Sequence, residues 1–216
     1  MLLPLRAHRL AILVAVLIGV LYGLPNILFM LSLREDYRGI PLLQTPNEAS
    51  YFARIQEVLD GHESLGSPFL FEYKDNPPLS PPLGEWLYAF PAFVFGISPA
   101  TVLIASKFIL PSVLFLLVYA FLVRLTSGGG TASKLTAIAG GLLIVLGYDL
   151  VDYRTVLSYL AGSDSPGSFL LWARPVNPIL GALFLFSLLL LVSSLLERKE
   201  RPALRVFGAA LFLALM

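Results

Sequence analysis

A long uncharged run near the start of the chain constrains its fold more than any other feature. Residues 10–33 read LAILVAVLIGVLYGLPNILFMLSL and follow directly after Arg6, His8 and Arg9. An α-helix needs about 20 apolar residues to cross a bilayer core of ~30 Å, so this run is long enough to span a membrane. It is too long for the apolar region of a cleaved signal peptide and lacks a small-x-small cleavage site, which favours an uncleaved signal anchor.

Further apolar runs predict an all-α, polytopic membrane protein. Hydrophobic residues make up 57% of the 216-residue chain, and the absence of Cys excludes disulfides and thiolate chemistry. We expect a single transmembrane domain over residues 1–216 with about five spans. The expected spans lie at about 10–33, 100–124, 134–153, 178–196 and 206–216. The last span is incomplete, which predicts that the sequence is a fragment of a longer protein.

The distribution of charge predicts the side on which each loop lies. Residues 83–97 contain Glu85 and Pro91 and would extend only ~22 Å as a helix, so we expect them to lie at the membrane interface. Eight of the 15 Lys and Arg residues, but only two acids, then share the side of the N-terminus. Because short cytoplasmic loops are rich in Lys and Arg, we expect a cytoplasmic N-terminus and long extracytoplasmic loops at 34–99 and 154–177.

The stretch TPNEASYFARIQEVLDGH, residues 45–62, predicts a helix along the outer membrane surface. Thr45 is a suitable N-cap, Pro46 fits the first helical position, and Glu48 stands where a capping box places its carboxylate. We therefore expect a helix over about 46–60. Its apolar residues recur at three- and four-residue steps, namely Tyr51, Phe52, Ile55, Val58 and Leu59. Capping of this helix could be the whole role of Glu48.

A second surface helix is predicted after Ser80-Pro81-Pro82, because prolines favour the first turn of a helix. Its large apolar residues recur at helical spacing and predict a buried stripe. They are Trp86, Leu87, Phe90 and Phe93. The connector SPFLFEYKDNPPLSPP, residues 67–82, is rich in aromatic residues and prolines. It can shape the rim of a pocket or serve only as an ordered crossover.

The order of these features resembles the N-terminal half of the GT-C glycosyltransferases, in particular the protein O-mannosyltransferases and the aminoarabinose transferases of lipid A. The residues that carry the resemblance are Asn47-Glu48-Ala49-Ser50-Tyr51, Arg54-Ile55, Lys74-Asp75-Asn76-Pro77-Pro78-Leu79 and Phe95-Gly96. The resemblance implies transfer of a sugar from a polyprenyl-phosphate-linked donor to an acceptor at the outer face. It also implies Mg²⁺ or Mn²⁺ as a candidate cofactor, and membrane lipid and a missing C-terminal half or subunit as partners, without nucleic acid.

The resemblance also implies roles for individual residues. In the family, an acidic residue of the first outer loop acts as a general base or holds a metal ion. Here that position is Asn47, and an amide cannot take a proton as a carboxylate does. The acid is then Glu48 or Asp36, or the chain is inactive or uses a different chemistry. The residues implied to contact the substrate are Tyr51, Arg54, Lys74 and Asp75.

The second outer segment adds two candidate groups of residues. Asp149 and Asp152 are three positions apart and share a helix face, where they could bind a divalent cation or form only a solvated helix end. They resemble weakly an acidic pair of oligosaccharyltransferase-like GT-C enzymes. Arg174 and Asn177 precede the span at 178–196, where a guanidinium can hold a phosphate at two points or anchor the span at the interface.

Two other functional classes fit the composition. A transporter or lipid flippase needs charges inside spans that face a cavity at the midplane, whereas most charges here lie in loops and at the ends of spans. The exception, Lys107, is close enough to the outer end of its helix for the ammonium to reach the interface. A non-catalytic GT-C-like membrane partner is the third class, and Asn47 favours it.

Overall fold

The computed structural model describes residues 5–43, 47–62, 66–67, 70–73, 76–77, 82–126, 130–151, 170–197 and 208. These residues form helices connected by turns and loops, and no strand occurs among them. The predicted all-α fold class is therefore confirmed for the part of the chain that the structure describes.

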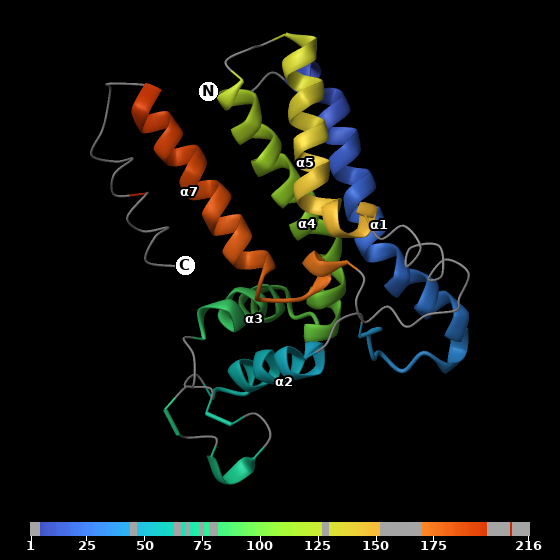
Figure 1. Ribbon diagram of the computed structural model, residues 1–216. Helices are drawn as coiled ribbons and strands as arrows, with labels where there is room; N and C mark the ends of the chain where they lie inside the picture. The colour runs from blue at the N-terminus through green and yellow to red at the C-terminus, as the bar shows by residue number, and fades with distance from the viewer. Residues whose placement is uncertain are drawn as a thin grey trace.

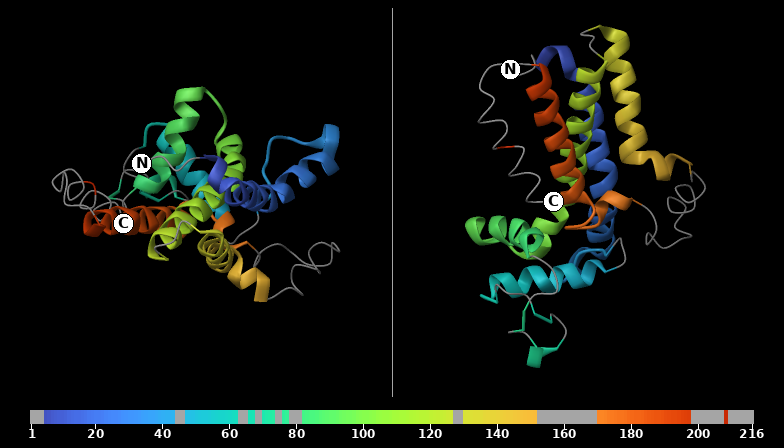
Figure 2. Two further views of the ribbon diagram at one scale, coloured as in Figure 1. Left: turned by 90° about the horizontal axis from the view of Figure 1, so that it is seen from above. Right: turned by 60° about the vertical axis from the view of Figure 1, so that its left-hand side comes forward.

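Four long helices run side by side in the described part of the chain (Figure 1). Their bounds are α1 Arg9–Leu33, α4 Pro99–Leu125, α5 Thr131–Val151 and α7 Ile179–Glu197. α4 is the central helix, because α1, α5 and α7 each pack along it, as the view down the bundle in Figure 2 also shows. Residues far apart in the sequence are thus fixed relative to one another through α4.

Two of these helices are long and apolar enough to cross a membrane. They are α1, together with the short 3-10 helix η2 (Arg34–Asp36) that follows it, and α4. α5 and α7 correspond to the runs expected at 134–153 and 178–196, but their described apolar segments are shorter. The span expected at 206–216 lies outside the described residues except for Gly208. Five spans therefore remain a prediction.

Small residues allow α1 and α4 to approach closely. A Cβ atom on Gly19 would lie 2.4 Å from Ser112 Oγ and 2.5 Å from the backbone oxygen of Phe108. On Gly23 it would lie 2.2 Å from the Phe108 ring. Ser112 Oγ donates hydrogen bonds to the backbone oxygens of Ala15 (2.7 Å) and Phe108 (2.8 Å). The contact between these helices depends on the absence of side chains at both glycines.

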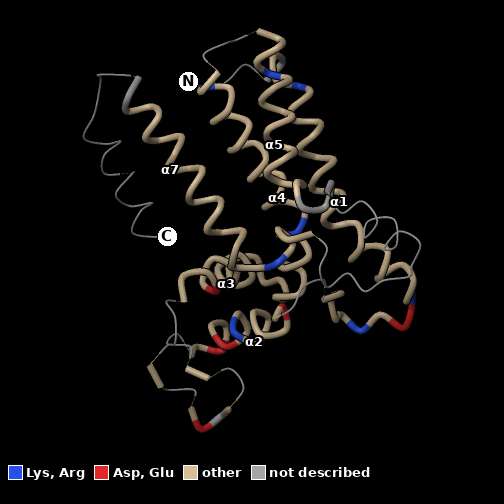
Figure 3. Tube along the Cα trace, viewed as in Figure 1, with Lys and Arg blue, Asp and Glu red and all other residues tan. Residues whose placement is uncertain are grey.

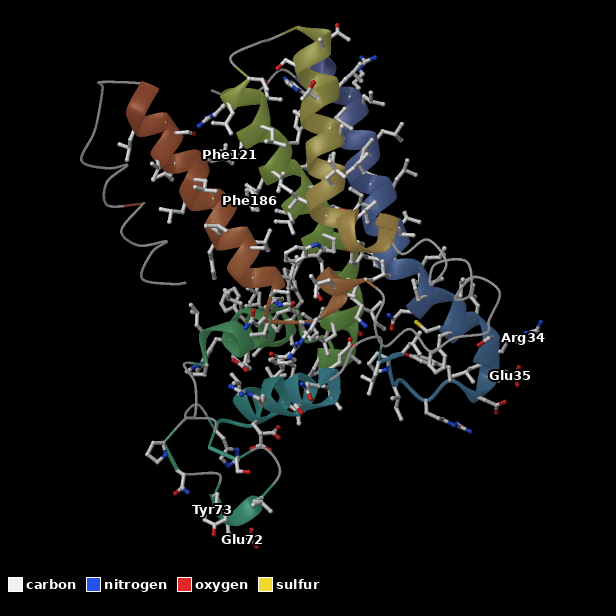
Figure 4. The ribbon with its side chains drawn as sticks, in the orientation of Figure 1. Arg34, Glu35, Glu72, Tyr73, Phe121 and Phe186 are labelled. Atoms are coloured by element: carbon white, nitrogen blue, oxygen red, sulfur yellow. The ribbon has the colours of Figure 1, made fainter. Side chains whose placement is uncertain are left out.

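α7 packs on α4 towards the opposite end of the bundle from α2 and α3. Phe121 of α4 and Phe186 of α7 meet edge to face with their ring centroids 6.2 Å apart (Figure 4). Arg124 Nη1 of α4 donates a hydrogen bond of 2.8 Å to the backbone oxygen of Leu190 in α7. An aromatic contact and a polar contact therefore join the two helices.

Two shorter helices, α2 (Glu48–Leu59) and α3 (Leu83–Phe95), lie across the ends of the long helices. In Figures 1 and 2, α3 lies between the near end of α7 and α2, and the 3-10 helix η3 (Phe71–Tyr73) lies beyond α2. α4 contacts both α2 and α3 directly. The turn from α3 into α4 is built from two local signals. Gly96 takes a left-handed conformation (φ 62°), which ends α3, and Ser98 Oγ accepts the N–H of Thr101, which caps α4.

The predicted stripe on the second surface helix has the wrong orientation. Trp86, Leu87, Phe90 and Phe93 do lie on one side of α3, but all four are exposed. The residues that α3 buries are Glu85, Tyr88, Ala89 and Ala92. Helical spacing determines which residues share a face, but it does not determine which face packs on the protein. The contacts of Glu85 and Tyr88 with other parts of the chain fix which face of α3 points towards the protein.

Candidate functional site

α2 begins at Glu48, two residues later than the sequence predicts. The preceding Asn47 is exposed, takes a left-handed conformation (φ 66°, ψ 6°) and makes no side-chain capping bond. Asn tolerates this conformation better than most residues do. Glu48 is therefore the first residue of the helix rather than the third, and the predicted capping box is wrong. Thr45 and Pro46 lie outside the described residues.

The Glu48 carboxylate is buried and paired with a lysine of α4. Its Oε1 atom contacts Lys107 Nζ, and the two residues are only 1% and 2% exposed. Lys107 lies about two turns into α4. Its ammonium does not reach the surface, in contrast to the sequence-based expectation. Isolated buried charges are costly, so each of these groups compensates the other.

The same lysine also holds the chain that leads into α2. Lys107 Nζ donates a hydrogen bond of 3.2 Å to the backbone oxygen of Leu42. The backbone N–H of Leu42 donates to Oδ1 of Asn26, a fully buried residue of α1, at 3.1 Å. Two long helices thus bind the backbone of one loop residue. This arrangement fixes the approach to α2 relative to α1 and α4.

A second ion pair joins α2 to α3. Arg54 Nε lies 2.7 Å from Glu85 Oε1, and the Glu85 side chain is 2% exposed. α2 therefore carries one acid and one base whose partners have the opposite charges, Lys107 in α4 and Glu85 in α3. Sliding or reversing α2 would break both pairs. The two contacts specify the position and the direction of this helix.

Arg174 approaches α2 from another part of the chain. It follows the 3-10 helix η5 (Leu171–Ala173), and its guanidinium carbon lies 5.7 Å from the centre of the Tyr51 ring. Arg174 is half-buried, and its Nε atom is buried without a hydrogen-bond acceptor. Among the described residues no carboxylate lies within ion-pair distance of Arg174. A guanidinium of this kind can bind an anionic group at two points.

The segment that carries Arg174 is fastened to α3. The backbone N–H of Val176 donates to the Tyr88 hydroxyl at 3.4 Å, and a Cβ atom on Gly84 would lie 2.3 Å from Val176 Cγ1. Burial raises the pKa of Tyr88 to about 12, outweighing a lowering effect of its hydrogen bond with Ser106. Tyr88 therefore stays protonated at neutral pH, which suits a structural hydrogen bond better than a base.

The structure brings some predicted site residues together and separates others. Glu48, Tyr51 and Arg54 all lie on α2. Glu48 pairs with Lys107, Arg54 pairs with Glu85, and Arg174 contacts the Tyr51 ring. Asp36 is exposed in η2 at the far end of α1, and Figures 1 and 2 both show η2 apart from α2. Figure 4 labels its neighbours Arg34 and Glu35 there.

The remaining predictions fall on residues with little or no described structure. Asn177 is exposed three residues after Arg174. Asp149 belongs to α5, but its side chain is not described. Lys74, Asp75 and Asp152 lie outside the described residues. Within the described part of the chain, no group of three or more His, Asp or Glu residues could hold a metal ion.

Sequence reasoning missed Lys107, Glu85 and Asn26 as parts of this arrangement. The signal for the first two is visible in the sequence, because each is a single charge inside an otherwise apolar run. Such a charge is costly in an apolar environment unless it has a partner. The identity of the partner is not visible, since Lys107 and Leu42 are 65 residues apart.

No family model, curated protein or solved structure matches the chain. The arrangement around α2 is therefore interpreted from its own chemistry. Glu48 is neutralised by Lys107, whereas Arg174 lies beside the Tyr51 ring and has no carboxylate partner among the described residues. These features suit recognition of an anion better than proton abstraction by Glu48.

Proposed function

We propose that this chain is the N-terminal part of a GT-C-like membrane glycosyltransferase that uses a polyprenyl-phosphate-linked sugar as donor. The observation that carries the proposal is Arg174, a half-buried guanidinium without a carboxylate partner among the described residues. It lies against Tyr51, within the segment Asn47–Tyr51 that resembles the family. A guanidinium can bind two oxygens of a phosphate at once, and it stabilises the charge of a phosphate leaving group.

The charge distribution along the bundle supports the membrane orientation that we propose. Figure 3 shows Lys and Arg residues at the end of the long helices where Arg9 begins α1 and Lys134 lies in the first turn of α5. It shows the acids of α2 and α3, together with further Lys and Arg residues, towards the other end. The basic end is then cytoplasmic, and α2 and α3 lie at the outer face. In this orientation α5, α7 and the residues after 205 complete five spans. The isoprenoid tail of the donor would contact the exposed apolar faces of the long helices.

Glu48 has a positioning role in this proposal rather than the role of the base. Its pair with Lys107 holds the first turn of α2, and it leaves Asn47 exposed at the helix start. Asp149 and Asp152 remain candidates for holding Mg²⁺ or Mn²⁺. A non-catalytic membrane partner is the second candidate function, and the observation that favours it is the amide at position 47, which cannot accept the proton of an acceptor.

We expect Arg174→Gln to weaken the binding of undecaprenyl phosphate about 10- to 100-fold, because hydrogen bonds to charged groups contribute about 1.5–3 kcal/mol. Arg174→Lys should retain part of the affinity, since Lys keeps the charge but loses the planar pair of donors. Native mass spectrometry of the protein in detergent micelles measures the affinity. Arg38→Gln, in an exposed loop, is the matched control. Equal affinities of Arg174→Gln and the wild type would contradict the proposed role.

Asn47→Asp should separate the two candidate functions. In a transferase with an impaired base, the new carboxylate is expected to raise sugar transfer or Mn²⁺ affinity, because the N-terminal end of α2 favours a negative charge. In a non-catalytic partner neither quantity should change. Transfer to an acceptor and Mn²⁺ titration in proteoliposomes measure both. Asp60→Asn, at the opposite end of α2, is the control for a change of charge alone.

A further inference from the structure

Every residue that α3 exposes is apolar. The exposed fractions are 39% for Trp86, 43% for Leu87, 65% for Phe90, 79% for Phe93, 53% for Val94 and 73% for Phe95. No charged or polar side chain interrupts this face, which we call the α3 aromatic face. A helix on the surface of a water-soluble protein has the opposite pattern, with its large apolar side chains directed inwards.

The polar groups of α3 lie on the opposite side, where the protein compensates them. Glu85 pairs with Arg54, and the Tyr88 hydroxyl accepts the backbone N–H of Val176. The other buried residues, Ala89 and Ala92, are small. α3 is therefore polar towards the protein and apolar towards its surroundings, as expected for a helix whose surroundings are hydrocarbon.

The neighbours of α3 indicate where those surroundings end. On one side is the near end of α7 (Figures 1 and 2), and α3 also packs against α4. α4 and α1 are the two helices long enough to span a membrane, and α1 exposes Leu13, Leu17 and Leu28. On the other side is α2 (Figures 1 and 2), where Gln56 and the exposed Asp60 form a hydrogen bond of 2.8 Å. The surface changes from apolar to polar over about one helix diameter, ~10 Å.

We propose that α3 lies in the plane of the membrane with its aromatic face among the lipid acyl chains, and that the membrane surface passes between α3 and α2. The lipid bilayer is the occupant that fits, because the α3 aromatic face carries no charge and α3 packs beside α4, in a bundle whose long helices also expose large apolar side chains. Trp and Phe near the headgroups are typical of membrane-surface helices. Lipid contact at α3 requires only that the long helices span a membrane, and it does not depend on sugar transfer.

This placement determines the depth of the anion-binding residue. The segment with Arg174 is attached to α3 through Val176, and its guanidinium contacts Tyr51 of α2. Arg174 consequently lies at the boundary between α3 and α2, which is the level of the lipid phosphates. A lipid-linked phosphate would reach it without leaving the membrane surface.

The natural absence of Cys allows single nitroxide labels to test the depth of α3. Phe93→Cys reports on the aromatic face, Leu17→Cys is the lipid-exposed standard in α1, and Asp60→Cys is the aqueous standard at the end of α2. The full chain is reconstituted in phosphatidylcholine vesicles, and collisions with oxygen and with a water-soluble nickel chelate are measured. We expect the label at position 93, like that at position 17, to collide more often with oxygen than with the nickel chelate. The label at position 60 should collide more often with the nickel chelate.

Two results would overturn the proposal. Nickel accessibility at position 93 equal to that at position 60 would place α3 in water. An immobilised label that neither reagent reaches would mean that protein, such as a second copy of the chain, covers the aromatic face.

The fluorescence of Trp86 provides an independent test that requires no substitution in α3. The chain contains two Trp residues, so Trp172→Phe makes Trp86 the sole indole. Vesicles of brominated phosphatidylcholine are expected to reduce its fluorescence at least twofold relative to unbrominated vesicles. Equal fluorescence in the two kinds of vesicle would contradict lipid contact even if a label at position 93 had disturbed the helix.

Discussion

Lys107→Met is expected to lower the free energy of unfolding by about 3–5 kcal/mol, the cost typical of removing one partner from a buried ion pair. The substitution leaves the Glu48 carboxylate buried without its cation and removes a donor to the backbone of Leu42. Methionine has nearly the same length as lysine, so the loss arises from charge and hydrogen bonding rather than from a cavity. Glu48→Gln should lower the free energy less, because glutamine can still accept a hydrogen bond from Lys107.

Chemical denaturation in detergent micelles, followed by circular dichroism, measures these free energies. The double variant Glu48→Gln, Lys107→Met should be destabilised by less than the sum of the two single variants, since no uncompensated charge remains buried. Lys134→Met, at the start of α5, is the matched control and should change stability by less than about 1 kcal/mol. Additive effects of the two single substitutions would show that the residues do not interact.

Gly19→Leu is expected to be the other severe substitution, with a loss of about 3 kcal/mol, at the upper end of the range for overpacking. A Cβ atom at this position would lie 2.5 Å from a backbone oxygen of α4, which cannot move by a change of rotamer. The helices would have to separate, and the hydrogen bond from Ser112 to Ala15 would break. The same denaturation experiment measures the loss.

Gly147→Leu provides the control for this substitution. A Cβ atom on Gly147 of α5 would have no atom within 4 Å, so the new side chain has space and the helix gains propensity. A second test uses Gly23→Ala, where the obstacle is the Phe108 ring rather than backbone. Phe108→Leu should rescue part of that loss. Equal stabilities of Gly19→Leu and Gly147→Leu would argue against close packing of α1 and α4.

The helices were predictable from the sequence because their signals are local. Apolar runs determine α1, α4 and α7, and Ser98 followed by Pro99 marks the start of α4 as the rules for helix N-termini require. The start of α2 was misplaced by two residues, because Asn47 takes a left-handed conformation that the preceding Thr45 and Pro46 did not predict. The orientation of α3 was not predictable, since spacing alone is consistent with either face pointing inwards.

Individual residues of the candidate site were predictable from the sequence, but the buried contacts between them were not. The resemblance to the GT-C family indicates Tyr51, and the ability of a guanidinium to bind a phosphate indicates Arg174; the structure places the two residues in contact. The pairing of Glu48 with Lys107 required knowledge of how α2 lies on α4, which depends on contacts between distant parts of the chain. Asp36 is close to Asn47 in the sequence, which makes it a candidate for the acid. The same lack of three-dimensional information hides that η2, which contains Asp36, lies apart from α2 in space.

The central position of α4 has a consequence for synthesis at the ribosome. Lys107 and the backbone of Leu42 that it binds are 65 residues apart. Glu48 of α2 precedes Lys107 by 59 positions. At about 5–20 residues per second, α2 waits roughly 3–12 seconds before its partner in α4 has been made. During that interval the Glu48 carboxylate cannot be buried as an ion pair, because Lys107 has not yet been made. Docking of α2 must therefore follow synthesis of α4, so the order of translation also sets the order of assembly.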